Sequence, residues 1–317
     1  MLKAAPKFGD NMVLQRNKRN LIWGTAPEQE VVEVCFLRHF YIAEVRDGKW
    51  EIELDPMDAG GPYTMDVYCK TEHLHFRNVM IGEVWLVCGK PDIINISFCH
   101  SQNVREKIHR GNAIHTYCLQ LENDNPGGVW GTYPENSTEY ENDFVYHFAK
   151  ALYTELRVPI GMMIYHDVKC SMMQQISEKV VPYGLRGVLL YQSLEDLCET
   201  FSRERIDYQV IRQWRELFMN KMLDIYLMQM PMHFLDKSDN WCMLRQKPSL
   251  GSGKEGITVI MDCNEYDKKE YPDKSCSAGR IAEHVLGKTY GRRTDDKASY
   301  KGEIQIKSAE MEYYFAG

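Results

Sequence analysis

Alternating hydrophobic and polar residues in the first eighty positions predict β-strands joined by tight turns. Residues 31–36, 50–54 and 63–68 alternate in polarity or are rich in β-branched side chains, which is typical of half-buried strands. Between them stand Asp47-Gly48 and Gly60-Gly61-Pro62, which supply the backbone angles that tight reversals need. We therefore expect a small antiparallel β-sandwich at the start of the chain.

A different pattern begins near residue 80, where short continuous apolar runs alternate with longer amphipathic segments. This pattern is typical of a parallel sheet covered by helices. Apolar residues recur at helical spacing over 144–152, 206–218 and 278–286, and the last of these helices is expected to end at Tyr290-Gly291. The buried strands that the apolar runs predict are 81–88, 159–165, 185–191, 223–230 and 256–262.

The expected fold class is therefore α/β, a doubly wound parallel sheet preceded by the small antiparallel β-sandwich. The change of pattern predicts a β-sandwich domain over residues 1–78, an α/β domain over 79–292 and an extended C-terminal tail over 293–317. Residues 101–136 are rich in Asn, Gly and charge, so we expect them to form a loop with some helix.

Composition and charge exclude several classes of partner. The 38 Lys and Arg residues against 45 Asp and Glu give a net charge of -7, and no basic run could follow a phosphate backbone, so no nucleic acid partner is expected. No apolar stretch approaches the roughly 20 residues that span a bilayer, so we expect no membrane crossing. The first residues lack the apolar segment of a secretory signal. The 10 Cys include no Cys-x-x-Cys pair, which excludes zinc-ribbon spacing.

The ends of the predicted parallel strands are the place to look for a site. In open α/β sheets, ligands bind beyond the carboxyl ends of the strands, where loops converge and helix N-termini offer unpaired N–H groups. The residues at the five strand ends are Gly89-Lys90-Pro91-Asp92, His166-Asp167, Gln192-Ser193, Pro231 with His233, and Asp262.

Several blocks of sequence, in a fixed order over roughly residues 8 to 291, match one protein family in both order and spacing. The blocks are Asn11-Met12-Val13-Leu14-Gln15-Arg16, Trp23-Gly24, Ala59-Gly60-Gly61-Pro62-Tyr63, Ile81-Gly82-Glu83-Val84-Trp85-Leu86, Glu155 to Gly161, Arg186 to Gln192, and Gly279-Arg280 with Lys288-Thr289-Tyr290-Gly291. The chain resembles the sialate O-acetylesterases in these blocks. The resemblance implies a β-rich module beside a flavodoxin-like hydrolase domain of the SGNH kind.

The family removes O-acetyl groups from sialic acid or related glycans by acyl transfer through a serine ester. The resemblance therefore implies a carbohydrate partner and no metal or other cofactor. It also implies a secreted, periplasmic or lysosomal protein, although no signal peptide is seen at the start of this chain.

The chain departs from the family at the positions that carry the chemistry. The family's Gln-Ser-Asn-Met, whose Ser is the nucleophile, corresponds to Lys90-Pro91-Asp92-Ile93, and its Ile-His-Pro, whose His is the general base, corresponds to Glu270-Tyr271-Pro272. Proline offers neither a nucleophile nor a backbone N–H. A phenol with a pKa of about 10 is almost wholly protonated at neutral pH and is a poor base.

At two further strand ends, other residues replace the sequence blocks of the family. The block with a Gly pair is replaced by His166-Asp167-Val168-Lys169, and Gly-Glu-Ser-Asn is replaced by Ser193-Leu194-Glu195-Asp196. The hypothesis that follows is a catalytically inactive homologue, or pseudoenzyme, that binds an O-acetylated glycan or a protein partner. Its predicted ligand pocket consists of Gly89, Lys90, Pro91, Asp92, Gln192, His233 and Tyr271.

Alternatives to this hypothesis remain open. An active carbohydrate O-acetyl ester hydrolase could use Ser193 as nucleophile, His166 or His233 as base, and Asp92 or Asp167 as the residue that orients the base. Cys88, inside a buried strand, is expected to be a small buried hydrophobe rather than a displaced nucleophile.

Two groups of residues have the chemistry of metal ligands. One consists of strand-end residues, namely Asp92, His166, Asp167, His233 and Asp262. The other is His73 with His75, which lie two apart on a probable strand and would face the same side. For the histidine pair we expect an ordinary polar strand face.

Overall fold

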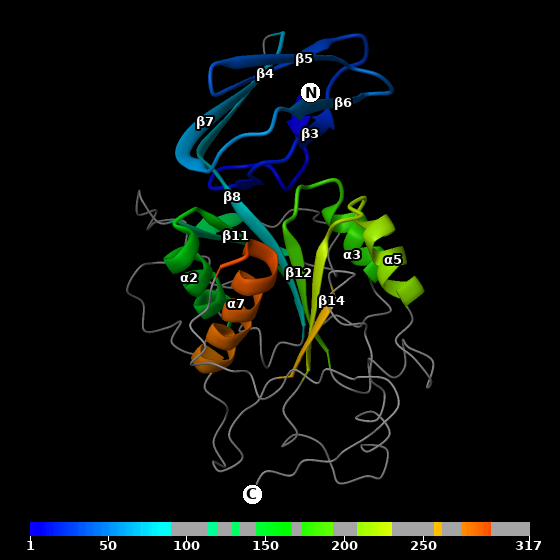
Figure 1. Ribbon diagram of the computed structural model, residues 1–317. Helices are drawn as coiled ribbons and strands as arrows, with labels where there is room; N and C mark the ends of the chain where they lie inside the picture. Colours follow the sequence, from blue (N-terminus) through cyan, green and yellow to red (C-terminus); the bar gives the residue numbers. More distant parts are fainter. Residues whose placement is uncertain are drawn as a thin grey trace, which may run out of the picture.

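The computed structural model describes residues 1–70, 72–89, 113–119, 129–132, 144–166, 173–192, 208–229, 257–261 and 274–292. Within these ranges the chain forms a β-rich part and an α/β part. Figure 1 shows the β-rich part at the top and the α/β part below it. Among the described helices, none combines the length and the hydropathy of a membrane span. The expected extended tail at 293–317 lies outside the described residues.

The β-rich part consists of two sheets that share one core. The first has three strands in the order β1 (Lys3–Ala4), β3 (Asn20–Thr25) and β6 (Lys49–Leu54). The second has β5 (His39–Glu44), β4 (Val31–Phe36), β7 (Gly60–Cys69) and β8 (Glu72–Gly89), with the short β2 (Val13–Gln15) parallel to β8. Strands therefore occupy all three of the ranges predicted from the alternating pattern.

Alternation of side chains gives each of these sheets its buried face. In β6, Trp50, Ile52 and Leu54 are buried, whereas the residues between them are exposed. They pack in the same cluster as Val34 and Phe36 of β4. The turn that leads into β6 has positive φ at both Asp47 and Gly48, which is the backbone conformation that Asp-Gly favours in a two-residue hairpin.

Strand β8 belongs to both parts of the molecule. Its first half pairs antiparallel with β7, and its second half pairs parallel with β11 (Ile160–His166) and β12 (Gly187–Gln192). Its burial changes accordingly, from alternating exposure to continuous burial from Val79 onward. The strand passes the predicted domain boundary at residue 78 without a break, and the division into domains stays a prediction.

The α/β part is built on a mixed sheet in the order β10 (Trp130–Thr132), β9 (Ile114–Leu119), β11, β8, β12, β13 (Asp224–Gln229) and β14 (Ile257–Met261). β10 is antiparallel to its neighbour, and the other strands run parallel. All five predicted buried strands are present. The prediction of loop and helix over 101–136 was wrong at 114–119 and at 130–132, which form strands.

The polar residues of β9 explain why its strand was missed. His115 and Thr116 interrupt the apolar run, yet both are buried. The Nδ1 atom of His115 lies 2.5 Å from the carbonyl oxygen of Asn11, a hydrogen bond to a residue far away in sequence. Burial of such a residue depends on a distant partner, so the hydrophobic pattern alone does not predict it.

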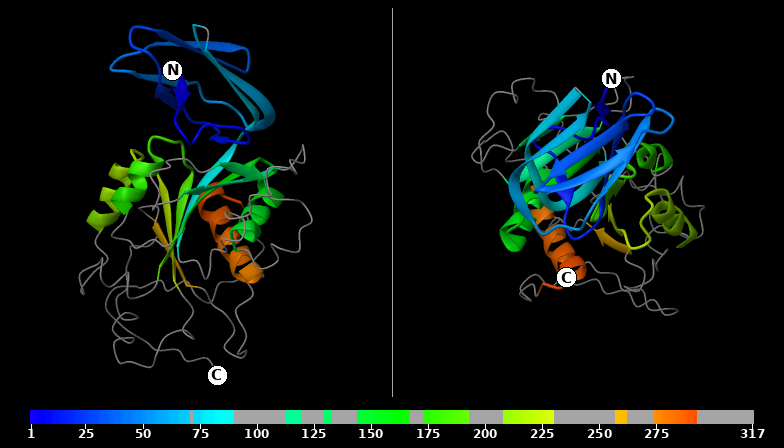
Figure 2. Two further views of the ribbon diagram at one scale, coloured as in Figure 1. Left: turned by 180° about the vertical axis from the view of Figure 1, so that it is seen from behind. Right: turned by 90° about the horizontal axis from the view of Figure 1, so that it is seen from above.

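Helices cover both faces of this sheet, as Figures 1 and 2 show. α2 (Phe144–Leu156) and α7 (Lys274–Tyr290) pack on one face, against Trp85, Val87 and Leu189. α3 (Met173–Val180) and α5 (Tyr208–Leu217) lie on the other face, which carries Leu86 and Leu190. Since alternate residues of one strand belong to opposite clusters, the sheet is buried on both sides. α7 ends at Tyr290, as predicted, and Gly291 follows with a φ of 62°.

The N-terminal segment adds a pH-dependent contact beside α3. Burial lowers the pKa of Lys7 to about 8, and the nearby charge of Lys179 acts in the same direction. The Lys7 Nζ lies 5.0 Å from the centre of the Trp23 ring, which partly offsets the cost of burying the charge.

Replacing Lys7 with methionine is expected to raise the free energy of unfolding at pH 7 by about 1–2 kcal/mol. Between pH 8 and the usual lysine pKa of 10.5, the unfolded chain holds one proton more than the folded chain, so wild-type stability rises with pH over this window. The stability difference between Lys7→Met and wild type should therefore shrink as the pH rises from 8 to 10.5. Urea denaturation of both proteins at pH 7, 9 and 10.5 would measure it. An advantage that is the same at all three values would contradict the expected pKa.

Candidate functional site

The parallel strands of the α/β part end level with one another and form a carboxyl edge. Gly89 at the end of β8 pairs with His166 at the end of β11. On the other side of β8, Leu190 pairs with Cys88, so that Gln192 at the end of β12 reaches about one residue further than Gly89. Gln229 of β13 continues this line by pairing with both Gln192 and Met261.

The chain changes direction within the sheet at β8. β9, β10 and β11, which follow β8 in the sequence, lie on one side of it. β12, β13 and β14, which come later, lie on its other side. Ligands of open α/β sheets bind at such a switch point, outside the carboxyl ends of the strands. Here the switch point lies at Gly89, between the ends of β11 and β12.

The structure describes only some of the predicted site residues. Gly89, His166 and Gln192 lie at the carboxyl edge by their backbone positions. The predicted site residues outside the described ranges are Lys90, Pro91, Asp92, Asp167, Ser193, His233, Asp262 and Tyr271. The predicted pocket, the alternative triad and the strand-end metal group therefore remain predictions.

Below the carboxyl edge, Cys88 of β8 and Tyr165 of β11 are neighbours across the two strands. Both side chains are fully buried, as expected for Cys88. Burial raises the pKa of Tyr165 to about 12, and the Cys88 thiol acts in the same direction. The hydroxyl is therefore protonated at neutral pH, and among the described residues it has no hydrogen-bond partner.

A buried hydroxyl without a partner costs free energy, so its removal should not destabilise the protein. Tyr165→Phe is expected to leave the free energy of unfolding unchanged or to raise it by about 1 kcal/mol. Chemical denaturation of the two proteins would measure the difference. A loss of more than about 1 kcal/mol would contradict the expectation that the hydroxyl has no hydrogen-bond partner.

Parts of several blocks quoted for the family resemblance lie at the opposite edge, where the parallel strands begin. Glu83 of β8 is almost completely buried, and its two carboxylate oxygens accept hydrogen bonds from Gln15 Nε2 at 3.0 Å and Arg16 Nε at 2.5 Å. The side-chain oxygen of Gln15 accepts a hydrogen bond from the backbone N–H of Val84 at 2.8 Å. These contacts join the N-terminal segment to β8. We call Gln15, Arg16 and Glu83 the Glu83 cluster.

A second polar cluster fixes the C-terminal end of α7 to the same edge. Asp224 lies 3.2 Å from Arg186 Nη2 and accepts a hydrogen bond from Thr289 Oγ1 at 2.9 Å. The backbone oxygen of Thr289 accepts a hydrogen bond from Arg186 at 2.9 Å. Beside this group, Trp85 Nε1 donates to Tyr290 Oη, and burial raises the pKa of that phenol well above its usual value, with the charge of Glu83 acting in the same direction.

These two clusters give a structural role to several residues of the quoted blocks. Gln15, Arg16, Glu83, Arg186 and Thr289 all come from blocks quoted for the resemblance, and they hold the strands, the N-terminal segment and α7 together. This role could not be predicted from the sequence. The only available signal was that charged residues stood beside apolar runs in those blocks.

Comparison with known proteins places the fold. No protein-family model and no curated protein matches the chain. Its structure is similar to that of a carbohydrate acetylesterase from Xanthomonas citri, with a TM-score of 0.72 and 20% sequence identity over 92% of this chain and 76% of that one. A salicylyl-acyltransferase from a tetracycline biosynthetic pathway aligns over 85% of this chain and 79% of its own, with 10% identity and a TM-score of 0.32. The first comparison shows that this chain has an esterase-like fold.

Proposed function

We propose that this protein is a catalytically inactive homologue of the sialate O-acetylesterases, which binds an O-acetylated glycan at the carboxyl edge of its sheet. The observation that carries the proposal is the proline two positions beyond the end of the central strand β8. β8 ends at Gly89, at the switch point of the sheet, and position 91, where the family has its nucleophilic serine, is proline. A proline there can neither attack an acetyl carbonyl nor donate a backbone hydrogen bond.

The arrangement of the strands supports the flavodoxin-like SGNH layout that the resemblance implies. Without β9 and β10, the strands β11, β8, β12, β13 and β14 stand in the order 2-1-3-4-5 when numbered along the chain. This is the flavodoxin-like order. We regard β9 and β10 as additions at one side of that sheet, and the two N-terminal sheets as the accompanying β-sandwich.

The exchange at the base position supports the loss of activity. The family's histidine corresponds to Tyr271, whose phenol holds its proton at neutral pH. Loss of the nucleophile or the base of a serine hydrolase lowers turnover by about 10⁶-fold, and the two losses do not add because the residues act as one unit. Hydrolysis of the family type should therefore be undetectable.

Retention of a polar edge supports binding without catalysis. Lys90, Asp92 and Gln192 still provide donors and acceptors of the kind that recognise sugar hydroxyl and acetyl groups. The structural neighbour of known activity acts on carbohydrate acetyl esters. An O-acetylated sialic acid is therefore the first ligand to test.

Calorimetric titration with O-acetylated sialic acid tests the binding proposal. We expect wild-type protein to bind it and Lys90→Ala to bind it at least tenfold more weakly, whereas Lys221→Ala, an exposed lysine beside β13, should bind like wild type. Circular dichroism would show that both variants are folded. Absence of binding to a broad panel of O-acetylated and unacetylated glycans would contradict the proposal and favour a protein partner.

One observation favours a second candidate, an active ester hydrolase with relocated residues. β11 and β12 flank β8, so His166 and Gln192 end the two strands nearest to Gly89, and Ser193 follows Gln192 in the sequence. Two strand spacings, about 10 Å, separate the backbones of His166 and Gln192. In this alternative Ser193 is the nucleophile, His166 the base and Asp92 the residue that orients it.

A further inference from the structure

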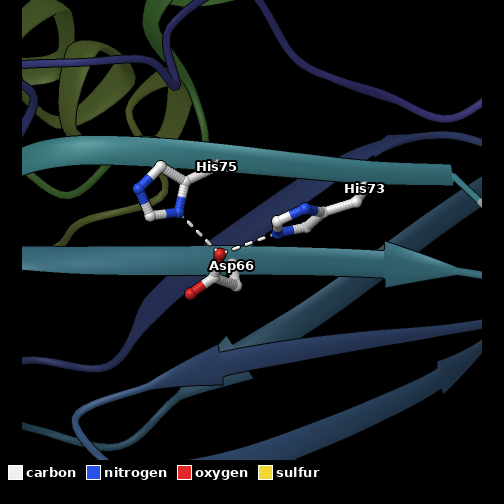
Figure 3. A group of neighbouring side chains, drawn as sticks. All are labelled: Asp66, His73 and His75. Carbon is white, nitrogen blue, oxygen red and sulfur yellow. Dashed lines mark hydrogen bonds and ion pairs between the residues drawn. The ribbon is translucent and has the colours of Figure 1, made fainter.

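Three polar side chains meet on the outer face of the β-rich part, far from the carboxyl edge. Figure 3 shows His73 and His75 of β8 both pointing toward Asp66 of the neighbouring strand β7. His73 Nε2 and His75 Nδ1 each lie 2.7 Å from Asp66 Oδ1. The side chains of His73, His75 and Asp66 are 44%, 37% and 22% exposed, so an ion in solution can reach them.

Strand register brings these residues together. β7 and β8 form an antiparallel pair in which Asp66 is opposite His75 and Tyr68 is opposite His73. Residues two apart on a strand face the same side, so both imidazoles stand on the face that carries Asp66. Tyr68 stacks on the His73 ring with centroids 4.4 Å apart and planes 4° apart, which limits the freedom of that imidazole.

Two imidazoles and one carboxylate form a donor set that suits zinc. Zn²⁺ binds histidine nitrogen and carboxylate oxygen at about 2.0–2.2 Å, which in a tetrahedral site puts ligand atoms about 3.4 Å apart. One donor atom from each of the three side chains lies within 4.8 Å of the others. Because these separations differ from 3.4 Å by only about 1.4 Å at most, small rotations of exposed side chains would close them around an ion.

We propose that Asp66, His73 and His75 form a surface binding site for a divalent transition-metal ion, with Zn²⁺ as its typical occupant. The three side chains would supply three ligands, and water or a group from another molecule would take the fourth position, which is open to solvent. Each imidazole would bind the ion through the nitrogen that now faces Asp66. In the neutral ring the single hydrogen would then move to the other nitrogen, Nδ1 of His73 and Nε2 of His75.

The charge around the cluster favours a cation on balance. On the adjacent strand β4, Cys35 is opposite Asp66 and Glu33 is opposite Tyr68, so a second carboxylate stands on the same face. Arg38 lines a shallow hollow together with Asp66 and is a nearby positive charge. A metal ion here would join β7 to β8 and would add to the stability of the β-rich part.

The metal site is independent of the proposed function. Residues 75 to 89 of β8 span about 45 Å of extended chain, so the cluster cannot take part in chemistry at the carboxyl edge. If the cluster binds no metal ion, the glycan-binding proposal is unaffected. If the protein binds no glycan, the metal-site proposal is likewise unaffected.

Calorimetric titration of the metal-free full chain with ZnCl₂ tests the site. Because the chain contains 10 His and 10 Cys, the measurement compares variants and does not rely on total stoichiometry. We expect His75→Ala and Asp66→Asn each to lower the affinity for one equivalent of Zn²⁺ by at least tenfold. His39→Ala is the matched control, since His39 is an exposed histidine on β5, and it should bind zinc like wild type.

Two measurements keep this result unambiguous. Circular dichroism would show that each variant is folded, and a thermal scan with and without ZnCl₂ would show a rise in Tm for wild type and His39→Ala that His75→Ala lacks. If wild type and His75→Ala bind the same number of Zn²⁺ ions with the same affinities, the cluster is only a hydrogen-bonded polar strand face and the proposal is wrong.

Discussion

Replacing Glu83 with alanine is expected to lower the free energy of unfolding by about 3–5 kcal/mol, the usual cost of breaking a buried ion pair. The Glu83 side chain is 3% exposed and that of Arg16 is 23% exposed, so the guanidinium left behind would keep little access to water. Gln15 would lose one of the two acceptors of its amide nitrogen, which donates to the same carboxylate and to the backbone oxygen of Arg16. Urea denaturation followed by tryptophan fluorescence would measure the change.

The exposed ion pair between Arg19 and Glu53 provides the control. Its atoms are 2.5 Å apart, as in the Glu83 cluster, but its side chains are 67% and 51% exposed. Glu53→Ala should therefore cost much less than Glu83→Ala, because solvent screens an exposed pair. If Glu83→Ala costs as little as Glu53→Ala, the buried carboxylate does not hold the N-terminal segment to β8.

Replacing Gly82 with alanine is expected to lower the free energy of unfolding by about 3 kcal/mol, because the new methyl group has no space. A Cβ atom at Gly82 would lie 1.9 Å from the backbone oxygen of Pro159. That oxygen cannot rotate away, and it also accepts a hydrogen bond from Glu83 N–H at 2.9 Å. Relief of the clash would have to separate β8 from the start of β11, beside the Glu83 cluster.

Gly279 in α7 is the matched glycine, since a Cβ atom there meets nothing within 4 Å. Gly279→Ala should raise the free energy of unfolding by about 0.5–1 kcal/mol, because alanine favours the helix. Chemical denaturation of the two variants would compare them directly. A Gly82→Ala protein as stable as wild type would show that β8 and the start of β11 can move apart freely.

The predictions that succeeded rest on short-range patterns. The five buried strands were predicted because each is a continuous apolar run, and the three helices because their apolar residues recur with the helical period. The end of α7 was predicted from one glycine. Ile114–Leu119 was missed because polar residues interrupt its apolar run, and the hydrogen bond that accompanies the burial of His115 goes to Asn11, more than 100 residues away.

The chemistry of the clusters could be predicted only in part, for the same reason. The strand pattern correctly predicted that His73 and His75 share a face, but not that Asp66 joins them. That contact depends on the register of β7 with β8, which pairs Cys69 with Glu72 and continues unchanged as far as Met65 with Phe76. The Arg16 contact with Glu83 links residues 67 positions apart, and no spacing rule predicts it.

The central proposal is that a protein with an esterase-like fold lacks the ester hydrolysis of the sialate O-acetylesterases that it resembles. The most direct measurement is the turnover of 4-nitrophenyl acetate and of O-acetylated sialic acid by wild type, Ser193→Ala and His166→Ala, compared with buffer alone. We expect all three proteins to match the buffer rate. Turnover by wild type that clearly exceeds this rate, and that disappears in either variant, would contradict the claim and establish a relocated active site.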